Sequence, residues 1–342
     1  MSRRALTLFL GTLLALALLV AGAVQTVPYV SLTPGPAFNT LGSVDGTPVL
    51  SITGHATYKD KGALDLTTVS VRDKISLYEA IRGWLSPSEA VVPREVVFPP
   101  DQTQQQADKE NTQQMQQSQD DATTAALREL GFPSTTTLSV GAVKAGGPAE
   151  GKVKAGDVLT TVDGVKVTDA ANLRTLISKH SIGQDVIVGY TRGGTAGSAT
   201  ITTIASTEKP PRPLIGITPS EVSSFPIKVD ITLKDVGGPS AGLMFALGII
   251  DKLGADSLTG GRNIAGTGEI TADGKVGAIG GIPQKMRGAK HEGATVFLSP
   301  ATNCDEAKAN KPPDLQLVKV STLKDALAAL AMLRAGGTPS TC

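Results

Sequence analysis

The sequence of 342 residues is poor in the side chains from which many enzymes build active sites. Its two cysteines and three histidines lack metal-site spacings and no HExxH motif occurs, so we expect no metal. None of the histidines, His55, His180 and His291, has the setting of a Ser-His-Asp triad. A GxxxxGKS/T phosphate loop is also lacking, so we expect no ATP site, and nothing indicates another cofactor. With a net charge of +1 and dispersed lysines and arginines, the chain gives no reason to expect nucleic acid as a partner.

Aromatic residues make up only 4% of the chain, whereas glycine and alanine are abundant. This composition suits a turn-rich α/β (α+β) protein, and the length allows about two or three domains. The two cysteines, Cys304 and Cys342, are either idle thiols or, in an exported protein, a disulfide that ties the tail to the last domain.

The N-terminus predicts export. Arg3 and Arg4 precede an uncharged run from Ala5 to Val24, which has the length of a transmembrane helix of ~20 residues and exceeds the ~7–15 residues of a signal-peptide core. The arginines would stay in the cytoplasm and place the rest of the chain outside. Ala21-Gly22-Ala23 fits a cleavage site, so a cleaved signal peptide stays open. Because the apolar run is longer than a signal-peptide core, we expect residues 1–26 to be an uncleaved single-pass anchor in the cell membrane.

Residues 27–132 are expected to form an N-terminal α/β region. Ser76 to Trp84 predicts a short helix capped by Ser76, with Trp84 in the core rather than at a ligand. The glutamine-rich stretch 102–121 is either a solvated helix that continues to Leu130 or a flexible linker, and we expect the helix. No chemistry is assigned to this region.

Residues 133–207 contain several short motifs typical of one module. They are Gly146-Gly147-Pro148-Ala149, Val153 to Leu159, and Val162 to Val167 with its Asp163-Gly164 turn. These motifs resemble the PDZ domains of bacterial proteases, which bind an extended peptide as an added strand. The resemblance makes Asn172 to Lys179 the groove helix and Leu173 and Leu176 weak candidates for peptide contacts.

The family's carboxylate loop is expected near residues 133–138. Thr135, Thr136 and Thr137 stand there in place of the usual apolar-Gly-apolar pattern, so they are weak peptide-binding candidates and carboxylate capture is in doubt. A PDZ-like domain with a purely structural role stays open. Residues 208–213 (Glu-Lys-Pro-Pro-Arg-Pro) predict a stiff linker, followed by a last domain over 214–342.

The last domain carries the motif with the clearest chemistry. Gly237-Gly238-Pro239-Ser240 predicts a tight turn, with a helix beginning at or just before Ser240, where free backbone N–H groups can hold an oxyanion. Ser240 could instead be an ordinary N-cap. Two segments follow it in the chain, Ala265 to Thr271 and Ile279 to Lys285.

These three segments together resemble the proteolytic domain of Lon proteases. The resemblance makes Ser240 the nucleophile, Lys285 its general base and Thr267 the support of the lysine, while the N–H groups of Ser240 and Gly238 would hold the oxyanion. Lysine can act as a base only if burial brings its pKa from ~10.4 towards neutrality. Gly237 stands where Lon usually has an acidic residue, and Asp235 is a weak substitute.

Anchor, PDZ-like and Lon-like regions together resemble membrane-bound, extracytoplasmic Lon-like proteases of Gram-positive bacteria, without the Lon ATPase module. We expect an ATP-independent serine endopeptidase that cleaves flexible or unfolded extracytoplasmic polypeptides. A homo-oligomer, a hexamer by resemblance, is implied. An inactive peptide-binding scaffold and a hydrolase of non-peptide acyl groups are the alternatives.

Overall fold

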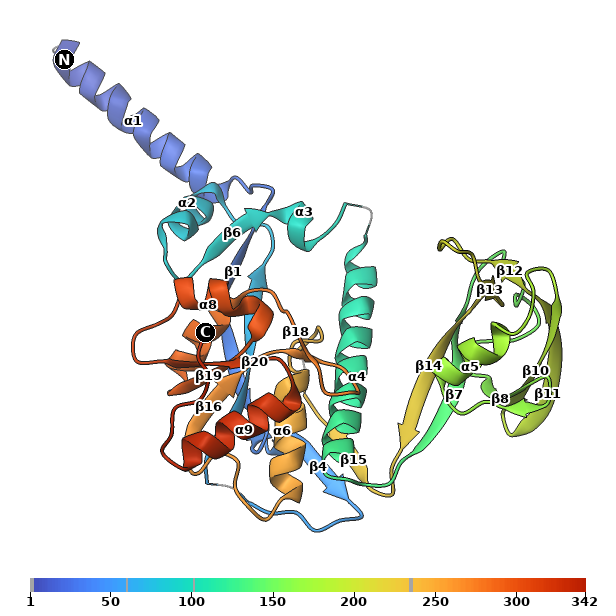
Figure 1. Ribbon diagram of the computed structural model, residues 1–342. Coiled ribbons are helices and arrows are strands. Elements are labelled where there is room, and N and C mark those ends of the chain that lie inside the picture. The colour runs from blue at the N-terminus through green and yellow to red at the C-terminus, as the bar shows by residue number, and fades with distance from the viewer. Residues whose placement is uncertain (1–2, 60, 101, 234–235) are drawn as a thin grey trace. The chain divides into compact units, whose positions relative to one another are not determined.

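The computed structural model describes residues 3–59, 61–100, 102–233 and 236–342. The chain forms two compact units, and the smaller one, Phe132–Pro226, is inserted into the larger one, Met1–Gly131 with Ile227–Cys342 (Figure 1). Helices and strands are mixed in the chain, as the α/β prediction requires. The smaller unit starts within one residue of the predicted boundary at 132, but residues 27–132 do not form a region of their own and fold together with the C-terminal part.

The larger unit contains a sheet built from both ends of the chain. In the described residues its strands lie in the order β20, β19, β16, β5, β1, β6. Their bounds are Tyr29–Asn39 (β1), Ala63–Arg72 (β5), Ala90–Pro93 (β6), Asn263–Gly266 (β16), Val296–Pro300 (β19) and Gln316–Val320 (β20). β5 runs antiparallel to β1 and parallel to β16, where Asp65 pairs with Ala265. This pairing closes one sheet from segments that lie far apart in the sequence, which is why residues 27–132 are not a region separate from the C-terminal part.

Helices cover this sheet, and α6 (Gly242–Leu253) is the most deeply buried. Nearly all of its side chains are apolar, and it packs against β5 and against α4 (Gln104–Glu129) (Figure 1). The glutamine-rich stretch is therefore a helix, and it buries one side, including Met115, Ser118 and Ala122, against its neighbours. The other helices of the unit's C-terminal part are α7 (Ile282–His291), η1 (Ala301–Asn303), α8 (Cys304–Ala309) and α9 (Leu323–Arg334).

Short elements complete the larger unit. β4 (Leu50–Thr53) pairs with β15 (Lys228–Ile231), which joins the N-terminal part to the segment that leads to Ser240. The remaining elements are β2 (Ser43–Val44), β3 (Thr47–Pro48), α2 (Leu77–Leu85), α3 (Arg94–Val97), β17 (Glu269–Ile270) and β18 (Val276–Gly277). At the N-terminus, α1 (Arg3–Val24) is long and apolar enough to cross a membrane, and a signal sequence would have the same properties.

The smaller unit is a second sheet with one helix, α5 (Ala170–Ile177), and its own core. The sheet order is β11, β10, β8, β7, β14, with β9 beside β8. The bounds are Thr135–Val143 (β7), Val158–Val162 (β8), Val165–Lys166 (β9), Asp185–Arg192 (β10), Thr195–Thr202 (β11) and Ile217–Ser224 (β14). Because β14 pairs with β7, the unit extends beyond the predicted boundary at residue 207.

The proline-rich stretch 208–213 is the tip of a hairpin within the smaller unit, not a linker between domains. β12 (Ile204–Ala205) pairs with β13 (Pro213–Leu214), and the Ser206 N–H donates to the Arg212 carbonyl at 2.8 Å. The chain therefore turns back on itself here. Residues 214–218, which the predicted boundary assigned to the last domain, therefore lie in the smaller unit instead.

Candidate active site

Ser240 lies in a turn that precedes α6. The helix begins at Gly242, later than predicted, and its N-cap is Ala241, which makes no side-chain capping hydrogen bond. Ser240 is therefore not an N-cap. Gly238 has φ +82°, a conformation that an L side chain rarely adopts, and this bends the chain into the turn. The result is a half-buried serine hydroxyl whose position is set by the turn rather than by helix capping.

Lys285 reaches this hydroxyl from the first turn of α7. The helix follows Gly281, whose φ of +72° ends the preceding loop, and Pro283 stands in its first turn. The Lys285 side chain is buried, with only 4% of its surface exposed. Its Nζ lies 2.7 Å from Ser240 Oγ and 3.0 Å from Thr267 Oγ1. The structure thus brings together the three residues that the sequence motifs single out.

Thr267 holds both members of the pair. It is fully buried between β16 and β17, and its Oγ1 donates to the Ser240 carbonyl at 3.0 Å while accepting from Lys285 Nζ. The Gly268 N–H donates to the same carbonyl at 2.9 Å. Two donors therefore fix the backbone of the serine, and one hydroxyl fixes both the serine and the lysine.

Burial changes the acidity of the lysine. Desolvation lowers the pKa of Lys285 from 10.5 to about 8, although the Glu269 carboxylate nearby acts in the opposite direction. Removing a charged ammonium from water costs free energy, so the neutral amine is favoured in this environment. A neutral amine 2.7 Å from a hydroxyl can accept its proton.

Helix α4 supports the serine turn, a role that the sequence did not reveal. The Ser118 Oγ donates to the Pro239 carbonyl at 2.9 Å, and the Gly238 N–H donates to the Asn111 carbonyl at 3.1 Å. The Gly238 N–H therefore has a partner, and the expectation that it holds an oxyanion does not fit this conformation. The only sequence signal was Ser118, a small polar residue in a glutamine-rich helix.

The packing of α4 also explains the glycine before the turn. A Cβ at Gly237 would lie 3.0 Å from the Asn111 Cβ, closer than most side-chain contacts. A side chain at this position would thus press against the helix. Asp235, the weak candidate for local polar support, lies outside the described residues.

The serine and the lysine open on a cleft of about 860 Å³. Residues 66–71 of β5 line it, together with Met115 of α4 and the loop residues Ile279 and Gly280. The cleft is open to solvent and has both apolar and polar walls, so an extended polypeptide segment can reach Ser240 without passing through an enclosed tunnel.

The smaller unit has a separate groove of about 280 Å³ between α5 and the start of β14. Its lining includes Leu173 and Ile177 of α5, together with Ile217 at the start of β14 and Ile215 just before it. Thr135, Thr136 and Thr137 do not line it, because they lie on β7, on the other side of β14 from the groove. Leu176 is not among the groove residues and is buried in the core of the unit. Of the predicted peptide contacts, only Leu173 is in the groove.

The residues that the sequence reasoning missed are Leu214-Ile215-Gly216-Ile217. This segment has the apolar-Gly-apolar pattern that was sought near residue 135, and it lies at the groove. The pattern was visible in the sequence but was assigned to the next domain. The strand order shows why: the groove strand comes last in this unit rather than first.

The remaining candidates lie outside both sites. Cys304 and Cys342 form a disulfide with a Cα–Cα distance of 5.0 Å. His180 contacts Asp163 in the smaller unit, while His55 and His291 are exposed, so none of them lines the serine cleft. Among the described residues no group of three or more metal-ligating side chains occurs.

Comparisons with known proteins find both modules. A family model of the Lon protease (S16) C-terminal proteolytic domain matches residues 227–332, and one of the PDZ domain matches residues 113–203. Lon protease 1 of Sorangium cellulosum is 39% identical over 100 residues, which cover 28% of this chain and 12% of that protein. Lon protease of Clostridioides difficile is 37% identical over 102 residues, 29% of this chain and 13% of that one. The chain thus spans about an eighth of these relatives.

Solved PDZ domains are also similar to part of the chain. That of the SdrC-like protein from Listeria monocytogenes is 31% identical and covers 24% of this chain and 84% of its own, with a TM-score of 0.22. The two family models, not this structural likeness, show that the chain contains a Lon-type proteolytic domain and a PDZ domain. The Lon-type domain supports the interpretation that this chain is a serine protease.

Proposed function

We propose that this protein is an ATP-independent serine endopeptidase in which Ser240 is the nucleophile and Lys285 the general base. The observation that carries the proposal is the 2.7 Å contact between Ser240 Oγ and the buried Nζ of Lys285, whose pKa burial lowers to about 8. A lysine with this pKa is neutral in an appreciable fraction of molecules near neutral pH, and a neutral amine can take the serine proton.

The reaction begins when Lys285 Nζ takes the proton of Ser240 Oγ as this oxygen attacks a peptide carbonyl carbon. The carbonyl oxygen becomes an oxyanion, and the Ser240 N–H, which donates to no other group in the described part of the chain, is placed to bind it. The Lys285 ammonium then gives its proton to the leaving amine. A water molecule, deprotonated by the same lysine, attacks the acyl carbon; the bond to Ser240 Oγ breaks, and the lysine returns its proton to this oxygen. Thr267 keeps the lysine in place throughout.

We further propose that α1 anchors the chain in the cell membrane and that the catalytic part lies outside the cytoplasm. Arg3 and Arg4 at the start of the apolar helix favour this orientation. The sequence has no phosphate-binding loop with which to drive unfolding, and the cleft is open. Substrates are therefore flexible or already unfolded extracytoplasmic polypeptides. A hexameric ring stays a prediction from the resemblance to Lon.

The PDZ domain would bind peptide ends in the groove between α5 and β14. Lys144, Arg174 and Arg212 are among its lining residues, so the charge of the groove suits a terminal carboxylate. The Gly216 carbonyl accepts the Lys144 N–H at 3.0 Å, which turns the backbone groups of Gly216 towards β7. In an antiparallel pair the backbone N–H and C=O groups of successive residues point to opposite sides of the strand, so those of Ile217 face the free edge of the sheet. Pro219, two residues further on, has no N–H with which to pair there. The strand can thus pair with only the last residues of a bound peptide.

The decisive experiment is intact-mass analysis of the full chain in detergent after incubation with a serine-reactive acylating probe. We expect one adduct on the wild type and none on Ser240→Ala or Lys285→Ala. Lys290→Ala is the matched control, since this lysine lies on the same helix and its Nζ contacts the Asp314 carbonyl instead. Digestion of an unfolded protein should follow the same order. If folded Ser240→Ala still cleaves, the dyad is wrong; if the wild type is never acylated, the inactive scaffold is the better description.

A further inference from the structure

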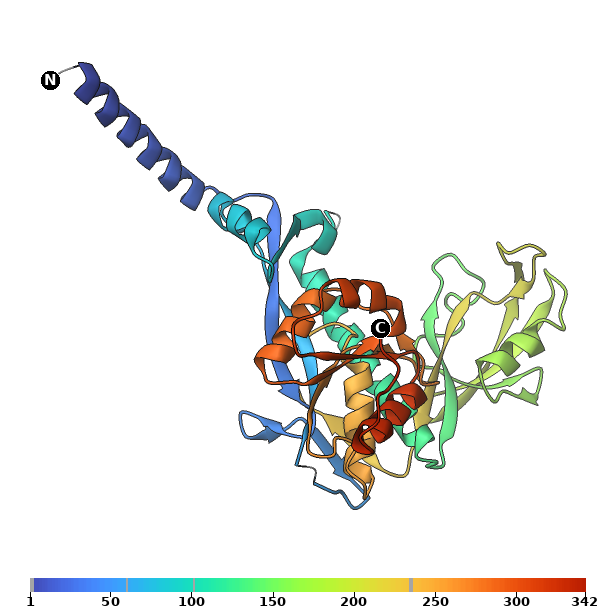
Figure 2. The same cartoon turned by 60° about the vertical axis from the view of Figure 1, so that its left-hand side comes forward.

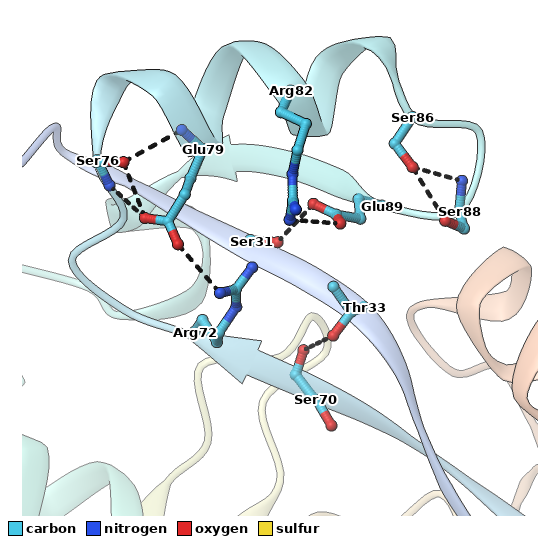
Figure 3. A network of polar contacts seen from close by, with 10 residues as sticks. All are labelled: Ser31, Thr33, Ser70, Arg72, Ser76, Glu79, Arg82, Ser86, Ser88 and Glu89. Atoms are coloured by element: carbon cyan, nitrogen blue, oxygen red, sulfur yellow. Dashed lines mark hydrogen bonds and ion pairs between the residues drawn. The ribbon is translucent and has the colours of Figure 1, made fainter. Parts of the chain in front are cut away.

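Helix α2 is amphipathic, but its charged side faces the protein and its apolar side faces solvent, the reverse of an ordinary surface helix. Its charged side chains point towards the rest of the unit: Glu79 contacts Arg72 at 3.2 Å, and Arg82 contacts Glu89 at 3.1 Å. Figure 3 shows both side chains extending from the helix towards the strands below it. Ser76 caps the helix and exchanges hydrogen bonds with Glu79 in a capping box, which fixes the rotation of the helix.

The opposite side of α2 carries large apolar side chains that face solvent. They form one stripe at helical spacing, with these exposed fractions: Leu77 40%, Tyr78 61%, Ile81 47%, Trp84 54% and Leu85 82%. The sequence placed Trp84 in the core, and the structure contradicts this. Single exposed apolar residues are ordinary, but five on one side of a nine-residue helix indicate a surface that is covered in use.

Hydrogen bonds place this stripe next to the end of α1. The Leu77 N–H donates to the Gln25 carbonyl at 3.0 Å, the Val27 N–H donates to the Ile75 carbonyl at 3.0 Å, and Thr26 forms a β-bridge with Ser76. The apolar helix ends at Val24, one residue before these bonds begin. The start of α2 is therefore held where a membrane-spanning α1 would leave the bilayer.

We propose that α2 lies on the outer surface of the membrane with its apolar stripe in the headgroup–acyl boundary. The inference rests on the proposed role of α1 as a span. The stripe contains Tyr78 and Trp84, the residue types that favour the membrane–water boundary. Trp84 is also held rigidly, because its indole N–H donates to the Val91 carbonyl at 3.3 Å and its ring stacks edge-to-face on Tyr29 with centroids 5.4 Å apart. The partner of this surface is thus the lipid itself, and α2 gives the anchor a second point of attachment.

The chain contains one tryptophan, so the tryptophan fluorescence of the protein comes from Trp84 alone and reports on the surroundings of this residue. The full-length protein is reconstituted into phosphatidylcholine vesicles, and its fluorescence is compared between ordinary lipids and lipids brominated near the headgroup end of the acyl chains. We expect about half of the emission or more to be quenched, because an interfacial helix lies about 5–10 Å into the headgroup–acyl boundary. Bromines at the chain ends should quench less, and aqueous iodide should quench less in vesicles than in detergent.

Variants separate lipid contact from general effects. Ile81→Asp places a charge in the stripe and should reduce the bromine quenching at least about twofold, since a carboxylate disfavours the acyl region. Val165→Asp alters a similarly exposed apolar residue in the PDZ domain and should leave the quenching unchanged. Circular dichroism checks that both variants are folded.

Flotation of the vesicles distinguishes failure of this inference from failure of the anchor. If the protein floats but Trp84 is not quenched by bromine, the anchor stands and α2 does not contact lipid. Protection from iodide without bromine quenching would show that a second protein copy covers the stripe, which also overturns the proposal. If the protein does not float, both the span and the docking of α2 are wrong.

Discussion

Replacing Lys285 by methionine should abolish acylation of Ser240 and at the same time stabilise the fold. Lowering the pKa of this lysine from 10.5 to about 8 corresponds to a cost of about 3 kcal/mol for holding the ammonium in its buried site. Methionine has a similar size and no charge, so it removes this cost. Loss of the hydrogen bonds to Ser240 and Thr267 takes back about 1 kcal/mol. The expected net gain is about 2 kcal/mol at pH 7.

The gain should depend on pH in a defined direction. Below pH 8 both the folded and the unfolded wild type hold the proton of Lys285, and the folded state bears the full cost. Between pH 8 and 10.5 the folded state has lost the proton while the unfolded state keeps it, so the stability of the wild type rises with pH. Above about 10.5 the cost is gone, and the variant should lose its advantage.

The assay is thermal unfolding of the full chain in detergent, followed by circular dichroism at several pH values. A gain of about 2 kcal/mol corresponds to a Tm higher by about 4–8 °C for a unit of this size. Lys308→Met, at an exposed lysine on α8, is the control and should change stability by no more than about 0.5 kcal/mol. A variant that is no more stable than the wild type at pH 7, or whose gain persists at pH 11, would refute the assignment of a buried, pKa-lowered base.

Three further outcomes are expected. The rate of acylation of Ser240 by the probe should rise about tenfold from pH 7 to pH 9 with a midpoint near 8, because the neutral lysine is the reactive form; a flat profile would contradict this. Thr267→Val should slow acylation about tenfold or more, whereas Thr267→Ser keeps the hydroxyl and most of the rate; equal rates would exclude a positioning role. Ser118→Ala removes a buried hydrogen bond to the serine turn and should cost about 1–2 kcal/mol in denaturant unfolding, and an unchanged midpoint would show that α4 does not support the turn.

The three side chains at the centre of the cleft could be named from the sequence because the segments that carry them resemble those of the Lon proteolytic domain. Ser240, Thr267 and Lys285 each stand in a short segment that can be recognised by itself, with glycines or a proline beside the functional residue. The contribution of α4 could not be read in the same way. Ser118 meets the serine turn only after the chain has passed through the whole of the smaller unit, and no local pattern encodes such a contact.

Two errors have a similar physical origin. The periodicity of α2 predicted the helix and its apolar side, but which side faces the protein depends on Arg72 and Glu89, which lie outside the helix. The groove of the PDZ domain was sought at its first strand, although the matching pattern lies at Ile215 to Ile217. Strand order in a sheet is set by long-range pairing, and the motifs alone do not reveal it.

The insertion of the smaller unit has a consequence for how the enzyme is made. Chains are synthesised from the N-terminus, and domains tend to fold as they emerge. Strands β1, β5 and β6 are complete early, but β5 must wait for β16, which is translated only after the whole inserted unit. The PDZ domain can therefore fold while its host is still an open half-sheet. The proposed nucleophile Ser240 and base Lys285 are also translated after the inserted unit, so a nascent chain should have no proteolytic activity until it extends beyond Lys285.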